Sequence, residues 1–384
     1  MSNTLKISLS IVFLVTILGF FFLMVWYTAY RLHVHFYGAS FWALQTGVAV
    51  VAIGSFAVSS FAGKFTNIFV RISSIIGGYA FLFLFFSFIL FAALHIIQLR
   101  WELPLLWSGV AVLATAFAVI FMGAVFGSSF IVKKNEVKIV GIEKGVSIML
   151  VSDVHLGHQR GQAYLTKIVE ETNKLHPDMV LIAGDLIEAE LALLPGVLDP
   201  LSKFKAPVYF TEGNHDRYLG IERVLKLIQK QGVRILHNEI VETHGIQLIG
   251  LDYMKADEKT FDMHPSDNPN TVKSVLARLP LKNGVPSILM HHSPVGVQYA
   301  DAAGIDLMLS GHTHAGQVFP FSLFAKLSFP FNSGLYQQGK TRVFVSNGAG
   351  TYMMRVRLGS FNEINFLKLV PGNSLGRGAK NAIP

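Results

Sequence analysis

The 384-residue sequence contains no cysteine, and this absence limits the kinds of site that it can form. Disulfide bonds and thiolate-bound metal ions are excluded, so any metal site must use nitrogen and oxygen ligands. Charged residues are also scarce, at 15% of the chain. The formal net charge of +8 is divided evenly, with +4 in residues 1–131 and +4 in the remainder. Because no segment is strongly basic, we expect no nucleic-acid partner.

The N-terminal third contains long stretches without Asp, Glu, Lys or Arg. Each is long enough to cross a hydrocarbon core, which requires about 20 apolar residues. These stretches are Ile7–Tyr30, Leu32–Gly63, Ile72–Leu99 and Leu103–Val132. We therefore expect four transmembrane helices within residues 1–132, in a multi-pass membrane protein in contact with membrane lipids.

The basic residues that flank these stretches predict an orientation. One side would carry six of them, namely Lys6, Lys64, Arg71, Lys133, Lys134 and Lys138. The other side would carry two, Arg31 and Arg100. Since Lys and Arg accumulate in cytoplasmic loops, we expect both termini and the soluble part of the chain to be cytoplasmic.

From Lys133 onward, short apolar runs alternate with helix-like segments. The predicted strands are Val146–Val151, Met179–Ala183, Val208–Thr211, Ser287–Met290, Ile305–Leu309, Arg342–Ser346 and Ile364–Leu369. The predicted helices include Ala163–Leu175 and Ile221–Gln231. This alternation indicates a layered α/β domain over residues 133–370 with much parallel pairing. We expect residues 371–384, which are rich in Gly and Asn, to form a disordered tail.

Five of the predicted strands are followed at once by side chains that bind metal ions. The sequences are SDVH (Asp153, His155), GD (Asp185), GNHD (Asn214, His215, Asp216), MHHSP (His291, His292) and GHTH (His312, His314). A single such cluster would suit a turn or a structural histidine equally well. Because ligand sites of open α/β sheets form at the carboxyl ends of strands, five clusters in these positions predict one shared metal site.

Asp, Asn and His ligands without Cys suit Mn²⁺, Fe or Zn²⁺. The set is too large for one ion and fits two divalent ions that share a carboxylate. Two ions roughly 3.5–4 Å apart activate a bridging hydroxide and hold the oxygens of a phosphoryl group during attack. We expect Gly184, Gly213 and Gly311 to let the backbone turn sharply, so that neighbouring side chains converge.

In this order, D-x-H, GD, GNHD, H-x-P and GHTH resemble the calcineurin-like metallophosphoesterase family over about Val146–Leu358. The segments IVEETNKLHPDMVLIAGDLIE and GLYQQGKTRVFVSNGAGTYMMRVRLG are similar to its bacterial membrane-associated branch. Met354 departs from that branch, which has a proline there. The resemblance implies a central β-sandwich flanked by helices and a binuclear metal centre.

The resemblance also implies a role for each residue of the motifs. One ion would be held by Asp153, His155 and His314, the other by Asn214, His292 and His312, with Asp185 between them. His215 would be the general acid or a hydrogen-bond donor to the phosphate, oriented by Asp216. His292 is preferred to His291 because it stands in the H-x-P register, and adjacent strand residues face opposite ways.

The sequence therefore predicts a membrane-embedded metal-dependent phosphoester hydrolase. It would cleave a phosphodiester, pyrophosphate or phosphomonoester bond by attack of a metal-bridged hydroxide. One alternative is a non-catalytic membrane sensor or transporter whose phosphoesterase-like domain binds a ligand, and another is a nuclease. The substrate, the native metals and the oligomeric state stay open at this stage.

Two further segments each allow two interpretations. Phe319–Phe331, sequence FPFSLFAKLSFPF, is rich in phenylalanine and has a single charge, Lys326. It either packs into the core or against the membrane helices, or it enters the lipid headgroup region and serves a lipid-linked substrate. Arg355 and Arg357 either meet a phosphate or lie on a solvated strand face.

Overall fold

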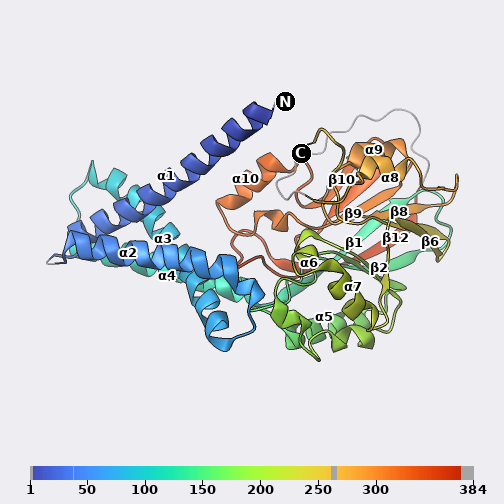
Figure 1. Ribbon diagram of the computed structural model, residues 1–384, viewed down its shortest axis with the longest axis horizontal. Coiled ribbons are helices and arrows are strands. Elements are labelled where there is room, and N and C mark those ends of the chain that lie inside the picture. The colour runs from blue at the N-terminus through green and yellow to red at the C-terminus, as the bar shows by residue number, and fades with distance from the viewer. Residues whose placement is uncertain (1–2, 38, 261–265, 373–384) are drawn as a thin grey trace. The chain divides into compact units, whose positions relative to one another are not determined.

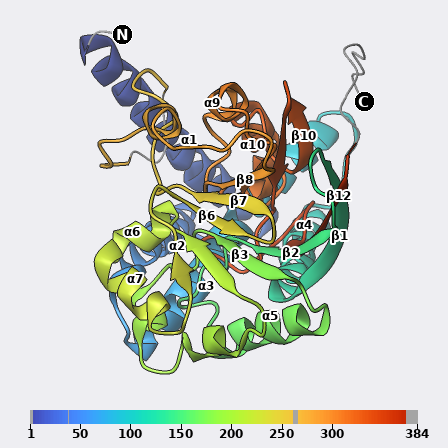
Figure 2. The same ribbon diagram turned by 90° about the vertical axis from the view of Figure 1, so that its right-hand side faces the viewer.

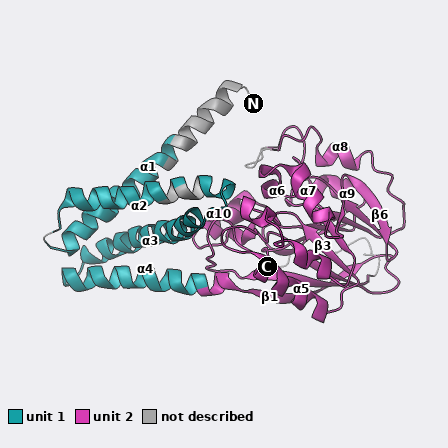
Figure 3. Cartoon of the chain, turned by 60° about the horizontal axis from the view of Figure 1, so that its bottom comes forward, with its two compact units in different colours: residues 1–124 teal, residues 125–384 magenta. Residues whose placement is uncertain are grey.

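A computed structural model describes residues 3–37, 39–260 and 266–372. The chain forms two compact units, Met1–Ala124 and Val125–Pro384, which Figure 3 distinguishes by colour. The first unit is helical, and the second contains all twelve strands of the described residues. Figure 1 labels many of the helices and strands by their number in chain order.

The first unit consists of α-helices and one short 3₁₀ turn, η1. Their bounds are α1 Asn3–His35, α2 Phe41–Phe61, η1 Ala62–Lys64, α3 Ile68–Gln98 and α4 Leu105–Ser128, and the end of α4 belongs to the second unit. Helices α3 and α4 are long and apolar enough to cross a membrane, whereas the described apolar stretch of α2, Phe41–Gly54, is shorter. Each predicted membrane segment therefore overlaps a helix, and α3 and α4 are the two described helices that are long and apolar enough to span a membrane.

The last apolar stretch divides between a helix and a strand. Helix α4 ends at Ser128, and strand β1 begins at Phe130, so residues 130–132 lie in a strand and not in the predicted helix. Val137 and Ile139 of β1 are buried in the core of the second unit, and β1 pairs with β12 along its whole length. Composition alone did not show this boundary because both elements are apolar where they meet.

The second unit is built on two six-stranded sheets, seen as two layers in Figure 2. The first has the order β1-β12-β2-β3-β4-β5 and the second the order β10-β11-β9-β8-β7-β6. The strands are β1 Phe130–Ile139, β2 Val146–Val151, β3 Met179–Ala183, β4 Val208–Thr211, β5 Arg234–Ile235, β6 Glu239–Thr243, β7 Ile246–Gly250, β8 Ser287–Met290, β9 Leu307–Ser310, β10 Gly334–Gln338, β11 Thr341–Val345 and β12 Asn362–Pro371. Pairing is parallel from β2 to β5 and from β7 through β8 and β9 to β11.

Each central strand is apolar on both faces because each sheet is covered on both sides. In β2, Ile148 and Leu150 enter the core between the sheets, while Met149 and Val151 pack in the outer layer. That outer layer includes Leu165 of α5 (Gln162–Lys174) and residues of α7 (Ile221–Gln229). Helices α8 (Val272–Leu276) and α9 (Val297–Ala302) cover the second sheet in the same way. Buried parallel sheets have this continuous apolar pattern.

The predicted mixed α/β domain with two sheets is confirmed. The seven predicted strands and two predicted helices correspond to β2, β3, β4, β8, β9, β11, β12, α5 and α7. The remaining helical segments of this unit are short: η2 Glu190–Leu193, η3 Asp199–Lys203, α6 Asn214–Tyr218, η4 His314–Gly316 and α10 Phe321–Ser328. The predicted tail starts at the last residue of β12, and residues 373–384 lie outside the described part of the chain.

Candidate metal centre

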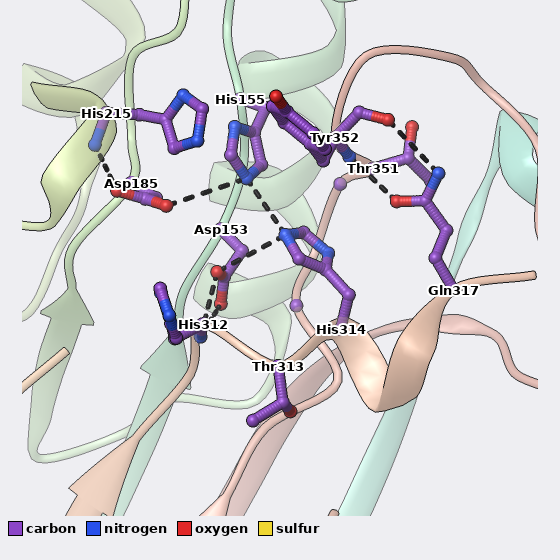
Figure 4. A network of polar contacts seen from close by, with 12 residues as sticks. Asp153, His155, Asp185, His215, His312, Thr313, His314, Gln317, Thr351 and Tyr352 are labelled. Atoms are coloured by element: carbon purple, nitrogen blue, oxygen red, sulfur yellow. Dashed lines mark hydrogen bonds and ion pairs between the residues drawn. The ribbon is translucent and has the colours of Figure 1, made fainter. Parts of the chain in front are cut away.

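The five predicted clusters follow strands of both sheets at their carboxyl ends. Asp153 and His155 follow β2, Asp185 follows β3, and α6 begins at Asn214 just beyond β4. His292 follows β8, and His312 and His314 follow β9 of the second sheet. The two sheets thus contribute side chains to one buried site (Figure 4).

Three overlapping groups of possible metal ligands occur in this site, and within each group the ligand atoms lie within 4.8 Å of one another. They are Asp153, His155 and His314; Asp185, His292 and His312; and His155, Asp185 and His215. The first two groups coincide with the two predicted sets, apart from Asn214. Asp185 belongs to the second and third groups, which is the position expected of a carboxylate between two ions.

The distances in the first group fit ligands of a common ion. His155 Nε2 lies 3.0 Å from His314 Nε2 and 3.8 Å from Asp185 Oδ2. His314 Nε2 lies 3.4 Å from Asp153 Oδ1. Since metal–nitrogen and metal–oxygen bonds are about 2.0–2.2 Å long, two ligand atoms of one ion lie roughly 3–3.5 Å apart.

The second group has the same spacing. His292 Nε2 lies 3.1 Å from Asp185 Oδ2 and 3.2 Å from His312 Nδ1. Asn214 is buried, and its Oδ1 has no hydrogen-bond partner among the described residues. A buried carbonyl oxygen without a donor is costly, and coordination of a cation satisfies it. These donors fit a second divalent ion.

Strained backbone conformations hold several of these side chains in place. Positive φ angles occur at Asp153, His155, Asp185, His312 and His314, between 50° and 73°. Non-glycine residues in this left-handed region cost roughly 1–3 kcal/mol each, and such strain concentrates at functional sites. Five of the seven predicted ligands are strained in this way, so the loops are shaped for convergence of their side chains.

All three predicted glycines allow a close approach of neighbouring atoms, and Gly184 also makes a turn. Gly184 has φ +78°, the turn that the sequence predicts. A Cβ on Gly213 would lie 2.2 Å from Asp185 Oδ1, and one on Gly311 would lie 2.1 Å from Asp153 Oδ2. Gly213 has a φ of −109°, which any residue adopts, so its role is to leave room for a carboxylate.

Other groups fix the orientation of the imidazoles. His292 Nδ1 lies 2.8 Å from the carbonyl oxygen of Ala183, which directs Nε2 toward Asp185. Glu188 Oε2 lies 3.5 Å from His155 Nδ1, and Glu188 also accepts a hydrogen bond from the Met353 backbone N–H. Partners of this kind fix the tautomer and raise the basicity of a ligating histidine. Glu188 is not among the site residues predicted from the sequence.

The protonation states favour metal binding. Burial lowers the pKa of the His155 and His314 imidazoles well below the usual value, so each offers a neutral lone pair near pH 7. Burial also opposes protonation of His292, but the Asp185 and Asp153 carboxylates outweigh it and raise the pKa of His292 to about 10. A ligating histidine must be deprotonated, so an ion replaces the proton that these carboxylates attract.

His215 and Asp216 differ from each other in burial and in the groups that they contact. The His215 ring centroid lies 4.8 Å from that of His155 and 5.0 Å from that of Tyr352, and its backbone N–H donates to Asp185 Oδ1. Asp216 is fully buried, and its carboxylate accepts hydrogen bonds from the backbone N–H groups of Asp185, Ile187 and Gly213. These bonds tie the loop after β3 to the start of α6, so Asp216 is a positioning residue.

His291 and Arg357 lie near the site but outside the ligand groups. His291 turns away from the ligand groups, and its Nδ1 lies 2.7 Å from the carbonyl oxygen of Ser293. Both readings of Arg357 were wrong, because it is fully buried and its guanidinium donates to the carbonyl oxygens of His314, Asn347 and Gly350. Arg357 therefore braces the loops around His314. Its bonds span up to 43 residues, and no local pattern predicts them.

Several known proteins are similar to this chain in sequence. A family model described as calcineurin-like phosphoesterase matches residues 146–316, which include every predicted ligand. An uncharacterized metallophosphoesterase of Helicobacter pylori is 36% identical over 247 residues, 63% of this chain and 64% of its own length. A transmembrane protein with metallophosphoesterase domain from Danio rerio is 34% identical over 238 residues, 59% of this chain and 53% of its own length.

A solved archaeal phosphodiesterase covers 54% of this chain and 86% of its own, with 14% identity and a TM-score of 0.32, a likeness too weak to support an argument. The aligned region spans 64% or less of these two curated relatives. The sequence matches, together with the convergence of Asp and His side chains at the ends of the strands, identify a calcineurin-like phosphoesterase domain over residues 146–316.

Proposed function

We propose that this protein is a membrane-embedded phosphoester hydrolase with a binuclear metal centre. The observation that carries the proposal is the position of Asp185, whose carboxylate lies 3.1 Å from His292 and 3.8 Å from His155. One carboxylate thus faces two sets of ligand atoms. The substrate class is a phosphodiester, a pyrophosphate or a phosphomonoester.

Each ion has its own donors in this proposal. Asp153, His155 and His314 would hold one, Asn214, His292 and His312 would hold the other, and Asp185 would contribute to both. The nitrogen and oxygen donors suit Mn²⁺, Fe or Zn²⁺. Such ions lower the pKa of a bound water and stabilise charge on the phosphoryl oxygens.

The chain supplies proton transfer and orientation. His215 is partly exposed beside His155, where it can protonate the leaving oxygen or donate a hydrogen bond to the phosphate. Asp216 holds the backbone of that loop through three N–H groups. Tyr352, whose ring lies next to His215, borders the same space.

We further propose that α1 to α4 are four membrane-spanning helices and that the catalytic unit faces the cytoplasm. The apolar lengths of α3 and α4 support spanning, and the excess of lysine and arginine on one side supports the orientation. The Danio rerio relative is named as a transmembrane protein, which also supports membrane-spanning helices in this chain.

Hydrolysis of an aryl phosphodiester and the matching monoester by the detergent-purified full chain tests the activity. We expect Mn²⁺-dependent turnover that chelation abolishes, and a loss of more than about 100-fold in Asp185→Asn, since even outer-shell partners of a metal contribute 10–100-fold. Asp178→Asn is the matched control, because Asp178 precedes the same strand that Asp185 follows. Full activity in Asp185→Asn would contradict the binuclear centre. Bound metal without turnover of either ester would favour the non-catalytic sensor.

A further inference from the structure

Helix α10 (Phe321–Ser328) exposes an apolar face although it lies in the catalytic unit. It has no buried residue, and Leu323, Phe324 and Leu327 are 50%, 64% and 84% exposed. Leu323 and Leu327 are four residues apart and therefore lie on one side of the helix. Contiguous apolar surface of this kind marks an interaction site.

The opposite face of α10 lines a polar cavity of about 570 Å³. Ser322 and Lys326, also four residues apart, form part of this wall. The cavity borders the metal centre, because Ala315 and Phe329 line it too. Ala315 follows His314, and the Phe329 ring centroid lies 5.7 Å from that of His312. Helix α10 thus separates an apolar exterior from a polar space beside the site.

Helix α10 packs closely on the loop that follows β9 and carries His312 and His314. A Cβ on Gly316 would lie 2.3 Å from Ser322 Cα and 2.9 Å from Ala325 Cβ. Only Ala315 separates this glycine from His314. The helix is therefore held against the loop that carries two predicted ligands, and its exposed face has a fixed relation to the metal centre.

The charge of the cavity favours an anionic group. Lys133 lines it but is paired with Glu363 at 2.6 Å. Lys326 takes part in no ion pair among residues 3–37, 39–260 and 266–372, so it adds a positive charge that no carboxylate of these segments balances. Asn332 and Ser333 add polar groups. Lipid head groups with a phosphate have the complementary charge.

The cavity also adjoins the end of an apolar helix. Within the second unit, the Phe126 ring of the last turn of α4 lies 5.4 Å from the ring of Phe361, which lines the cavity. Lys133 lies five residues after Ser128, the end of α4, and five residues of extended chain span at most about 18 Å. If α4 crosses a membrane, the cavity lies close to the surface of that membrane.

We propose that the Leu323, Phe324 and Leu327 face of α10 inserts into the lipid bilayer and that the substrate of the metal centre is a lipid-linked phosphoester. This inference rests on the proposed hydrolase function and names its substrate class. The acyl chains of the lipid stay in the bilayer beside α10, while the polar cavity accommodates the head group next to the ligands. An amphipathic helix with leucine and phenylalanine on one face and a lysine on the other is suited to the headgroup region.

The absence of cysteine permits a direct test of insertion. A nitroxide label is attached to Leu327→Cys or to Val140→Cys in the full chain, reconstituted in phosphatidylcholine and phosphatidylglycerol vesicles. Val140 is 49% exposed and lines neither the cavity nor the metal centre. We expect collisions with oxygen to dominate at position 327 and collisions with a water-soluble nickel complex to dominate at position 140. Equal access of the nickel complex to both labels would overturn the insertion of α10.

A pair of substrates tests the lipid linkage. Nitrophenyl hexadecyl phosphate in the vesicles and nitrophenyl ethyl phosphate in water carry the same scissile bond. The double variant Leu323→Ser with Leu327→Ser should lose about tenfold or more in kcat/KM for the hexadecyl ester, because its serine face gains no apolar burial in the bilayer. The ethyl ester should be unaffected, as should both esters with Val140→Ser.

The outcomes separate this inference from the proposed function. Equal losses on both esters would make α10 a structural element and overturn the lipid linkage, as would no loss on either. Wild-type turnover of the ethyl ester alone would also overturn it. Wild-type turnover of neither ester would instead overturn the proposed hydrolase function, whereas the nitroxide measurement judges the insertion of α10 independently.

Discussion

Glu188 places a carboxylate beside a predicted ligand from outside the set of metal-binding residues. Its carboxylate lies 3.5 Å from His155 Nδ1, and desolvation raises the pKa of Glu188 to about 7. The residue stands in the sequence GDLIE, three positions after Asp185. A glutamate there has no local feature that distinguishes it from a solvated one, because its partner is 33 residues away.

We expect Glu188→Gln to lower metal affinity or kcat by about 10–100-fold, because outer-shell partners of ligating histidines contribute by that amount. Metal titration monitored by activity, together with metal content after gel filtration, measures the effect. Glu190→Gln is the matched control, since Glu190 is partly exposed and pairs with Arg223 at 3.0 Å. Equal behaviour of the two variants would show that Glu188 does not orient His155.

His215 can be tested as the general acid through the leaving group. We expect His215→Gln to lower kcat by about 10²–10⁴-fold for an alkyl leaving group, which must be protonated as it departs. The loss should be much smaller for a nitrophenyl leaving group, which departs as a stable anion. Bound metal should stay the same. Loss of one ion per chain would instead make His215 a ligand, as its place in the group with His155 and Asp185 allows.

Residues at strand ends were the most predictable part of the site. The parallel strands are apolar runs in the sequence, and Asp, Asn and His residues follow directly after them. The sequence therefore predicted that these side chains converge. The hydrogen bonds that hold the ligand loops in place were not predictable. Arg357 reaches His314, and Asp216 reaches Asp185, through bonds that depend on how the loops fold over one another. Asp216 was identified by its motif, but its three backbone partners were not.

At the scale of elements, β4 and β9 are each followed within two residues by a glycine at the site. Gly213 and Gly311 each leave the space that a neighbouring carboxylate occupies. The sequence predicted a turn at both positions, which was the wrong physical reason. The close approach of a carboxylate oxygen to each glycine points to volume, since neither residue has a positive φ.

Gly311→Ala is expected to displace the Asp153 carboxylate, since its Cβ would lie 2.1 Å from Oδ2 and 2.6 Å from Ser152 Oγ. Overpacking of a buried site costs about 1–3 kcal/mol in the free energy of unfolding. Activity should fall with the loss of a ligand, and thermal unfolding with and without Mn²⁺ measures both effects. Gly161→Ala is the control, because nothing lies within 4 Å of a Cβ there. Unchanged activity in Gly311→Ala would show that the loop yields easily.

The strands that were not predicted from the sequence are β1, β5, β6, β7 and β10, and most of them lack a distinct apolar run. Strand β5 is two residues long, and β10 is partly exposed. The hairpin of β6 and β7 has Glu242, Thr243 and His244 around its turn, so polarity obscured the first strand. Strand β1 was merged with the preceding membrane segment, because alternation of exposed and buried residues in β1 begins without a polar break after α4.

At the scale of the whole molecule, the chain joins an apolar helical unit to a catalytic unit through the α4–β1 connection, where Ser129 alone separates the two elements. This short connection keeps the metal-binding domain near the membrane if α4 spans it. It also fixes the side of the membrane on which the domain lies, because a single intervening residue cannot cross a bilayer about 30 Å thick. The location of the enzyme therefore depends on the number and direction of the spans.

Single cysteines in this cysteine-free chain distinguish four spans from two. Tyr37, Lys64, Glu102 and Lys340 are exposed and lie between or after the helices. With four spans and cytoplasmic termini, a membrane-impermeant maleimide should label Tyr37→Cys and Glu102→Cys in intact cells. It should label Lys64→Cys and Lys340→Cys only after permeabilisation. If α3 and α4 alone cross the membrane, position 37 should behave like position 64, because both then precede the first span. Labelling of position 340 in intact cells would place the catalytic unit outside, since the side of that unit follows from α4.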